Sequence, residues 1–265
     1  MNKPTQNQID HWISKSLKSL AQTDEDFRTG FYVEEEIPIQ SVHVGTASFY
    51  ASLARAKFLN GDPVDEFRAE FAQAARYIMK SFTMAYDESD PDYLGEAAVL
   101  EWVCETTGIE GMNWALMSAD FELAAEVAGH YRTRPDGDML SLRSNRYANA
   151  LALTLRDQPL PAMELIAAQF EDYKKKPPKS PAARNYYSLI LALYGILAGE
   201  RERFHEGIEL QLKSYAPYAR GEAKDTDEEF ICDHAVALVI LAQHRQGWLA
   251  VTDERLPKGL PVPAP

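Results

Sequence analysis

The sequence Ser180–Tyr215, SPAARNYYSLILALYGILAGERERFHEGIELQLKSY, predicts a hairpin of two helices joined by a tight break. Ser180 can cap the first helix, and Pro181 suits the first helical position because its missing N–H is not needed there. The segment Tyr186–Ala198 is apolar on nearly every side, which is typical of a helix buried all round. Gly199 can end this helix in the left-handed conformation. The second helix has a single apolar face, formed by Phe204, Ile208, Leu212 and Tyr215.

The same hairpin pattern recurs at three further breaks, which end at Asp62, Asp120 and Asp157. In each case an Ala- and Leu-rich apolar helix leads to a short acidic break and then to a helix with one apolar face. The spacing between the breaks is uneven, and the signature residues of tetratricopeptide or HEAT repeats are missing. No segment shows a convincing strand alternation. The sequence therefore predicts an all-α fold of about eleven helices, an irregular array of helical hairpins packed as one globular domain.

The expected single domain covers residues 1–265 in three parts. A peripheral helix and loop occupy 1–40, the helical-hairpin core occupies 41–247, and a C-terminal tail occupies 248–265. The peripheral helix is expected over Gln6–Ala21, with a buried side formed by Ile9, Ile13, Leu17 and Leu20. The following segment, 23–39, is expected to be the least helical region because it contains a glycine, an acidic run and a proline.

Side chains that can cap a helix mark three further helix starts in the core. Asp62 and Asp90 each precede a proline that suits the first helical position, and the helix after Asp90 is expected to run through Cys104. Thr226, with Glu229 three residues later, has the pattern of a capping box and predicts the start of the last helix.

Two sequence features concern packing. The segment Ala235–Ala242 in the last helix is wholly apolar and must be buried. Gly195 and Gly199 form a G-x-x-x-G pair, which indicates close approach of two helices in a soluble core.

The charge balance restricts the classes of partner. Lys plus Arg number 27 and Asp plus Glu number 40, which gives a net charge of −13. Such a chain is poorly suited to nucleic acid, because phosphate binding needs cations that displace counterions. It is equally unsuited to anionic membranes. A cationic protein partner fits the charge, although acidity that merely maintains solubility is an equally good interpretation.

The sequence has no feature of a secreted, disulfide-linked or membrane protein. Cys104 and Cys232 are too few for a disulfide framework, and their apolar surroundings favour buried free thiols. The N-terminus lacks the apolar core of a signal peptide. The longest apolar run is far shorter than the roughly 20 residues that span a bilayer. We therefore expect a cytoplasmic protein.

No catalytic or metal-binding motif is present. The chain lacks G-x-S-x-G, Walker A, H-E-x-x-H and G-x-G-x-x-G, and its histidines are scattered at positions 11, 43, 130, 205, 234 and 244. Asp233 and His234 beside Cys232 form the single grouping that could act together. Adjacent residues on a helix point about 100° apart, so a structural role for His234 is favoured. We expect no enzymatic activity, cofactor or metal.

Two acidic segments are the candidates for partner binding, since loops between rigid helices present side chains without disturbing the core. The first consists of Tyr86, Asp87, Glu88, Asp90, Asp92 and Tyr93, and the second of Asp225, Asp227, Glu228 and Glu229. Tyrosines offer contact area at low entropic cost, and carboxylates can meet Lys or Arg. The alternative is that these are ordinary solvated loops. The basic run 174–179 is likewise interpreted as a solvated connector in preference to a contact patch.

The second half resembles the immunity protein 49 family of bacterial polymorphic toxin systems. The resemblance rests on the apolar helix that ends in Ala198-Gly199-Glu200-Arg201-Glu202-Arg203-Phe204 and on the terminal helix FICDHAVALVILAQHRQG, which is followed by Leu256-Pro257. The sequence Gln243-His244-Arg245-Gln246-Gly247 follows the arginine-glycine ending of that family only loosely.

This resemblance implies a cytoplasmic all-α protein that binds and neutralises one cognate toxin, and it carries no catalytic residue to this chain. A nuclease toxin would be cationic where it grips phosphate, which suits an acidic inhibitor. The competing hypotheses are a helical scaffold or adaptor for another protein, and a small-molecule enzyme on an all-α bundle. The sequence leaves the toxin, its chemistry and the oligomeric state open.

Overall fold

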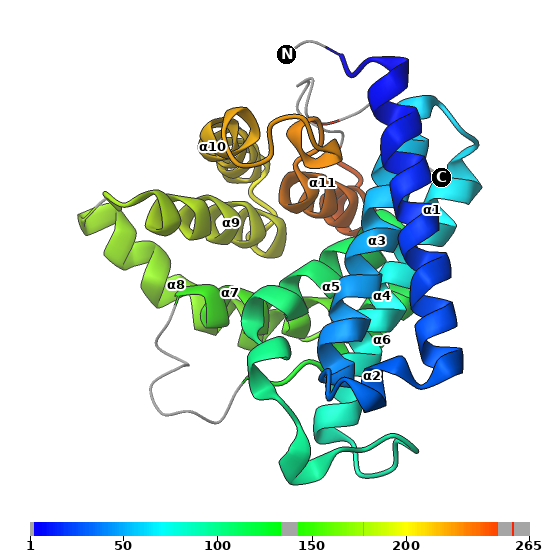
Figure 1. Cartoon of the computed structure of the whole chain (residues 1–265). Coiled ribbons are helices and arrows are strands. Elements are labelled where there is room, and N and C mark those ends of the chain that lie inside the picture. The colour runs from blue at the N-terminus through cyan, green and yellow to red at the C-terminus, as the bar shows by residue number, and fades with distance from the viewer. Residues whose placement is uncertain (1–2, 134–142, 177, 249–255, 257–265) are drawn as a thin grey trace. The chain divides into compact units, whose positions relative to one another are not determined.

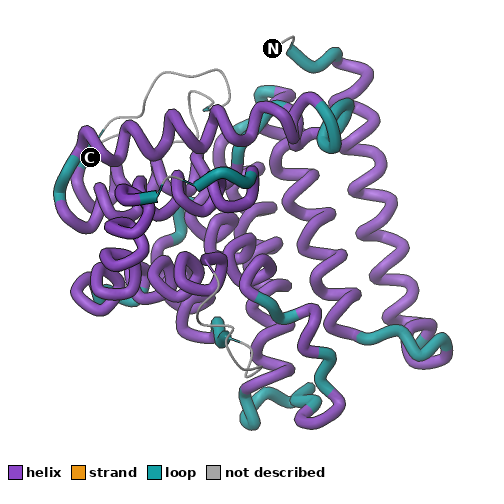
Figure 2. The backbone as a smooth tube through the Cα atoms, turned by 90° about the vertical axis from the view of Figure 1, so that its left-hand side faces the viewer, coloured by secondary structure: helices purple, strands orange, loops and turns teal. Residues whose placement is uncertain are grey.

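The computed structural model describes residues 3–133, 143–176, 178–248 and Leu256. Within these residues it contains eleven α-helices, three short 3-10 helices and no strand, which confirms the all-α prediction (Figures 1 and 2). The chain divides into two compact units, residues 2–134 and 135–265. The boundary falls inside the predicted core, and the single-domain organisation stays a prediction.

The first unit is built on three long helices. Its helices are α1 (Gln6–Thr29), α2 (Phe31–Glu34), α3 (Ile39–Asn60), α4 (Val64–Tyr86), α5 (Glu105–Met117) and α6 (Phe121–His130). α3 packs against both α1 and α4, and α4 also packs against α5 and α6. Short connections make α1, α3 and α4 alternate in direction, so the end of α1, the start of α3 and the end of α4 share one end of the unit (Figure 1). Phe71, Ile78 and Phe82 of α4 are fully buried between these helices.

The N-terminal region is more helical than the sequence predicts. α1 continues past Ala21 to Thr29 and ends at Gly30, whose φ of 78° is left-handed; α2 follows at once. The segment 22–29 has neither Gly nor Pro, so nothing in it stops the helix before Gly30. Leu17 is also not on the buried side, being 51% exposed. Trp12, Ser16 and Thr23 are buried with Ile9 instead.

The predicted helix from Asp90 through Cys104 is absent. This segment holds two 3-10 helices, Gly95–Ala97 and Leu100–Trp102, and α5 begins at Glu105. The physical reason is tertiary: the Asp90 carboxylate binds side chains of α4 instead of capping a helix. Asp62 also fails as a cap, since Pro63 occupies the capping position and the Asp62 carboxylate accepts a hydrogen bond from Asn60.

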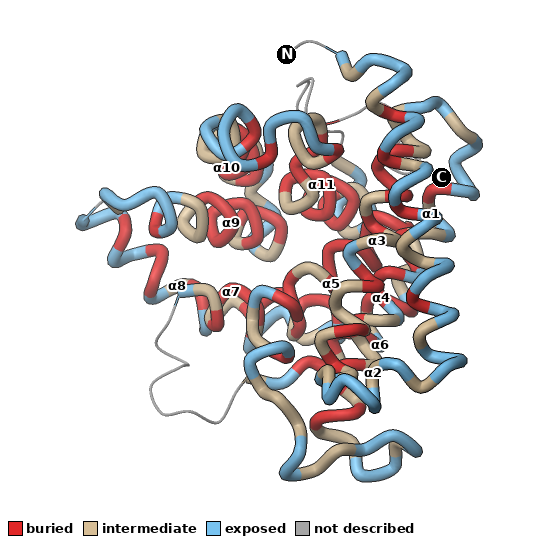
Figure 3. The backbone as a smooth tube through the Cα atoms, in the orientation of Figure 1, coloured by how far each residue is buried: buried red, intermediate tan, exposed pale blue. Residues whose placement is uncertain are grey.

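The second unit contains the predicted hairpin. Its helices are α7 (Arg143–Leu155), α8 (Pro159–Lys175), α9 (Pro181–Ala198), α10 (Arg201–Arg220) and α11 (Asp233–Gln246). The Ser180 hydroxyl accepts a hydrogen bond from the Ala183 N–H at 3.2 Å, and Gly199 ends α9 with φ 69°. Phe204, Ile208 and Leu212 of α10 are buried, as expected (Figure 3).

Close contact between α9 and α10 depends on two glycines that face each other's helices. A Cβ at Gly195 would lie 2.4 Å from the backbone nitrogen of Phe204, and one at Gly207 would lie 2.4 Å from that of Ala192. The G-x-x-x-G prediction is therefore right for Gly195. It is wrong for Gly199, which has open space around it and serves as the helix cap.

The last helix is buried as predicted but begins later than expected. Residues 235–242 are all buried, while α11 starts at Asp233. Thr226 precedes a 3-10 helix, Asp227–Glu229. Its hydroxyl donates to the carbonyl of Ala223 and accepts no capping hydrogen bond. The Tyr215 hydroxyl lies within hydrogen-bond distance of the carbonyls of both Glu228 and Ile231, and this contact ties the connection before α11 to α10. Of the predicted tail, only Trp248 and Leu256 lie within the described residues.

Candidate functional site

A row of six aromatic rings runs from the surface into the first unit. Successive rings lie between 5.1 and 5.8 Å apart, in the order Phe31, Tyr32, Phe27, His43, Tyr77 and Tyr50. The rings come from α2, α1, α3 and α4, so the row joins four helices. Edge-to-face and offset stacked contacts of this kind stabilise the arrangement beyond the area they bury.

The outer end of this row is exposed and apolar. Phe27 is 39% exposed, Phe31 40% and Val33 83%. We call Phe27, Phe31, Tyr32 and Val33 the aromatic corner. Its turn is held by the left-handed Gly30, by the Tyr32 hydroxyl donating to Asp26 at 3.3 Å, and by the Ile37 N–H donating to the Tyr32 carbonyl at 2.9 Å. The corner is thus a fixed feature, which sequence periodicity alone did not indicate.

Carboxylates surround the aromatic corner on both sides in the sequence. Asp24, Glu25 and Asp26 precede it, and the run 34–36 supplies three glutamates after it. Arg28, which adjoins the corner in the sequence, is already paired, because its guanidinium lies 2.6 Å from Glu25. The C-terminal end of α1 adds partial negative charge.

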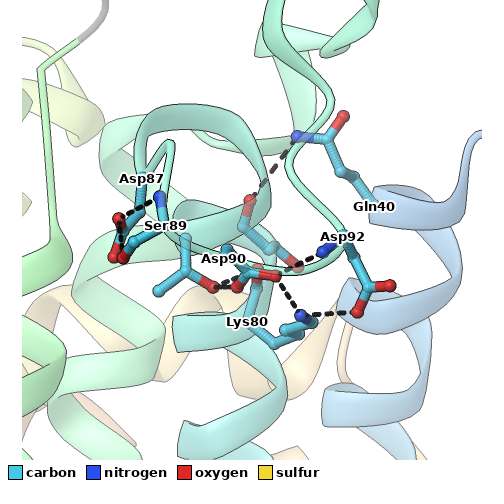
Figure 4. Close-up of polar contacts among 8 residues, drawn as sticks. Gln40, Lys80, Asp87, Ser89, Asp90 and Asp92 are labelled. Carbon is cyan, nitrogen blue, oxygen red and sulfur yellow. Dashed lines mark hydrogen bonds and ion pairs between the residues drawn. The ribbon is translucent and has the colours of Figure 1, made fainter.

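The first predicted acidic loop lies at the same end of the unit. The start of α3 connects the two features, because the Gln40 side chain accepts a hydrogen bond from the Val99 N–H at 2.7 Å. Its amide nitrogen also donates to the Ser81 carbonyl at 3.5 Å (Figure 4). The exposed carboxylates around this end include Asp24, Glu25, Glu34, Glu35, Glu36, Glu88 and Asp92. We call these seven side chains, together with the aromatic corner, the acidic end.

Asp90 itself is turned into the loop. Its side chain is 8% exposed, and its carboxylate lies 2.5 Å from the Lys80 ammonium (Figure 4). The Thr83 hydroxyl and the Asp92 N–H also donate to it, the latter at 2.9 Å. Burial alone would raise the pKa of Asp90, but these three donors outweigh it and lower the pKa to about 2. Asp90 therefore fastens the loop to α4.

Of the other predicted residues in the first loop, two make contacts within the unit and three are exposed. Asp87 accepts hydrogen bonds from the hydroxyl and N–H of Ser89 at 2.6 and 3.0 Å, and these lower its pKa. Tyr86 is half-buried against Phe82. Glu88, Asp92 and Tyr93 are exposed, although Asp92 also lies 2.7 Å from Lys80.

The second predicted patch, residues 225–229, lies in the other unit, and most of its carboxylates are buried or bind groups in α10 and in the connection after it. Asp227 is buried, and Glu228 accepts a hydrogen bond from the Tyr218 hydroxyl at 2.5 Å. Glu229 accepts one from the Asp225 N–H at 2.9 Å. Asp225 is exposed, with a left-handed φ of 65°. Compared with the first loop, this patch presents fewer exposed carboxylates.

The described residues do not form a chemical centre of the kind that a metal would occupy. No group of three or more His, Cys, Asp or Glu side chains among them is placed to hold a metal ion. Burial lowers the pKa of His234 to about 4 and, with a contribution from the Lys80 charge, that of His43 to about 4. Both imidazoles are therefore neutral near pH 7. Cys104 and Cys232 are free thiols, and Cys232 is buried as the sequence predicts, but Cys104 is only half-buried.

Comparison with protein-family models, with curated proteins and with solved structures finds no match for this chain. Among the described residues, no helix combines the length and the apolar character needed to cross a bilayer. The acidic end is therefore described from the positions of its own side chains alone. The signal that could have revealed the corner is an aromatic and aliphatic cluster around Gly30 between two acidic runs, an arrangement that becomes meaningful once α1 is known to end there.

Proposed function

We propose that this chain is an immunity protein, which binds a cognate antibacterial toxin in the cytoplasm and neutralises it by covering its active or substrate-binding surface. The observation that carries the proposal is the acidic end of the first unit, where exposed apolar side chains stand among seven exposed carboxylates. The proposal assigns the chain no catalytic step and no cofactor.

The layout of the acidic end supports a protein partner. Protein–protein interfaces place aromatic and large apolar residues at the centre and polar residues at the rim. Phe31 and Val33 provide such a centre, and the carboxylates provide the rim. The ring contacts of Tyr32 and Phe27 hold the corner in place before any partner arrives. Less conformational entropy is then lost on binding.

The charge of the acidic end selects a basic partner. Carboxylates on one surface accelerate encounter with a cationic protein and repel anionic competitors. A nuclease toxin is the case that fits best, since its phosphate-binding surface must be cationic and could be covered by this face. The overall charge of −13 and the resemblance to immunity proteins support the same partner class.

The proposed binding surface includes part of the first acidic segment predicted from the sequence, but its centre is a different group of residues. Glu88, Asp92 and Tyr93 remain in it, because their side chains are exposed. Asp90 leaves it, because its carboxylate is bound within the loop. The aromatic corner becomes the centre.

The direct test is co-expression with the toxin encoded by the adjacent gene, followed by affinity measurement on the purified pair. The double variant Phe31→Ala/Val33→Ser should weaken binding at least ~10-fold and abolish growth protection, since truncating one interface hot spot costs about 2 kcal/mol or more. Its melting temperature should fall only slightly, because Val33 is 83% exposed and Phe31, which is 40% exposed, loses one ring contact with Tyr32. The control is Leu160→Ser, which removes an apolar side chain that is 76% exposed on α8.

A charge-matched pair of variants tests the electrostatic part. Glu34→Gln/Glu35→Gln/Glu36→Gln should slow association several-fold at low salt and have little effect at high salt. The control variant neutralises three exposed glutamates of α10, Glu202, Glu206 and Glu209. If neither acidic-end variant changed the affinity or the association rate, the interface would lie elsewhere on the chain. A chain that does not bind the toxin at all would overturn the immunity function and favour an adaptor for another protein.

A further inference from the structure

The second unit contains a groove where α7, α8 and α9 meet. Its volume is about 400 Å³, and its walls include Arg143, Tyr173, Lys176, Lys179, Ser180 and Ala183. Arg143 begins α7, Lys176 follows the end of α8, and Ser180 caps α9. The groove therefore brings together segments that lie more than thirty residues apart in the sequence.

The groove is cationic in a chain that is otherwise strongly acidic. Arg143, Lys176 and Lys179 outnumber the one carboxylate in its wall, that of Asp172. Among the residues that the structure describes, no ion pair joins Lys176 or Lys179 to a carboxylate. By contrast, the neighbouring Lys174 is paired with Glu171 at 2.8 Å. Two lysines without a carboxylate partner among the described residues, beside the Arg143 guanidinium in the same groove, attract an anion.

Packing at the base of the groove holds these groups in place. Tyr173 is buried, with its hydroxyl accepting a hydrogen bond from the Gln169 amide at 3.0 Å and its ring packed edge-to-face on Tyr187. The Arg143 guanidinium lies 5.6 Å from the centre of the Tyr173 ring, which positions it by a cation–π contact. The N-terminal end of α9 adds partial positive charge beside Ser180.

We propose that this groove binds a small phosphate-bearing molecule, independently of the toxin-binding function proposed above. The phosphoryl oxygens accept hydrogen bonds from Arg143, Lys176 and Lys179, and the remainder of the molecule lies against Pro178 and Ala183. A planar guanidinium matches phosphate geometry, and lysines supply mobile point charges. The volume is that of a small-ligand site, which favours a small molecule over a peptide. The basic run 174–179 is thus split: Lys176 and Lys179 form a site, and Lys174 pairs with its own helix.

Isothermal titration of the full chain with inorganic pyrophosphate tests the proposal, with citrate as a carboxylate anion for comparison. We expect saturable binding that weakens with salt and is tighter for pyrophosphate than for citrate. Neutralising one exposed cation should lower affinity about 3-fold, and the triple variant Arg143→Gln/Lys176→Gln/Lys179→Gln at least ~10-fold. The matched control is Lys15→Gln/Lys18→Gln/Lys213→Gln, which removes the same charge from exposed positions outside the groove and should change affinity less than ~2-fold.

All six substituted side chains are exposed, so we expect both triple variants to keep the wild-type melting temperature. That measurement shows whether the variants are folded. Equal loss of binding in the groove and control variants would mean that net charge alone attracts the anion, and the site would be refuted. Absence of saturable binding up to ~10 mM pyrophosphate would also refute the site. The dissociation constant would then lie above 1 mM, which corresponds to a binding free energy of less than about 4 kcal/mol. Tighter binding of hexaglutamate than of pyrophosphate would assign the groove to an acidic peptide and overturn the small-molecule proposal.

Discussion

Replacing Asp90 by asparagine tests the interaction that fastens the 87–93 loop to α4. The substitution preserves the side-chain shape and one acceptor oxygen but removes the charge paired with Lys80. In the folded chain the pKa of Asp90 is lowered from 3.8 to about 2. One pKa unit corresponds to about 1.4 kcal/mol, so the ionised carboxylate stabilises the fold by on the order of 2 kcal/mol near pH 7. The Asp90 side chain is 8% exposed but that of Lys80 is 29% exposed, so with solvent screening this value is an upper limit.

The sign of the pH dependence follows from the lowered pKa. The stabilisation is fully present above pH 3.8, where the unfolded carboxyl is ionised, and it is lost as the pH falls towards 2. We therefore expect Asp90→Asn to lower the free energy of unfolding at pH 7 and to approach the wild type at low pH. Urea unfolding over a pH series measures the difference. Hydrogen exchange of the Asp92 amide, which donates to Asp90 at 2.9 Å, should accelerate in the variant.

Asp92→Asn provides the matched control for Asp90→Asn. The Asp92 carboxylate also lies 2.7 Å from Lys80, but its side chain is 62% exposed. Exposed ion pairs contribute about 0–1 kcal/mol, so this variant should remain close to the wild type. Equal destabilisation by the two variants at pH 7, or an Asp90→Asn effect that does not diminish between pH 7 and pH 2, would refute the reasoning.

Two further predictions concern packing and protonation. Gly207→Ala should destabilise the second unit by about 1–3 kcal/mol, because the new Cβ would lie 2.4 Å from the Ala192 backbone; the control Gly45→Ala, with open space at its Cβ, should be neutral or slightly stabilising in the same thermal melts. His43, whose pKa is lowered from 6.5 to about 4 by burial and by the Lys80 charge, should make the wild type lose stability as the pH falls from 6.5 towards 4, since the unfolded chain then binds the extra proton. His234, whose pKa is also lowered to about 4, contributes to the same slope, so His43→Phe should reduce the slope without abolishing it. An unchanged slope would show that the His43 imidazole does not contribute.

The sequence by itself determined the parts of the fold that depend on neighbours along the chain. The α9–α10 hairpin is predictable because Ser180, Pro181 and Gly199 act on the backbone within a few residues of their own positions. The burial of Ala235–Ala242 follows equally directly, since a wholly apolar helix has no face that favours water. The segment 23–39 was expected to be the least helical region, and that prediction was less accurate. α1 extends into this segment as far as Thr29 because the first residue that stops the helix is Gly30.

Only the tertiary structure decided which charged side chains are exposed and which groups meet. Asp90 and Asp92 are two residues apart in the sequence, yet Lys80 and Thr83 of α4 bury one and leave the other at the surface. Packing of α1, α2, α3 and α4 produces the aromatic corner, and the meeting of Arg143 with Lys176 and Lys179 produces the basic groove. The physical reason is the same in each case: hydrogen bonds, ion pairs and ring contacts between distant residues depend on positions in space that local propensity does not encode.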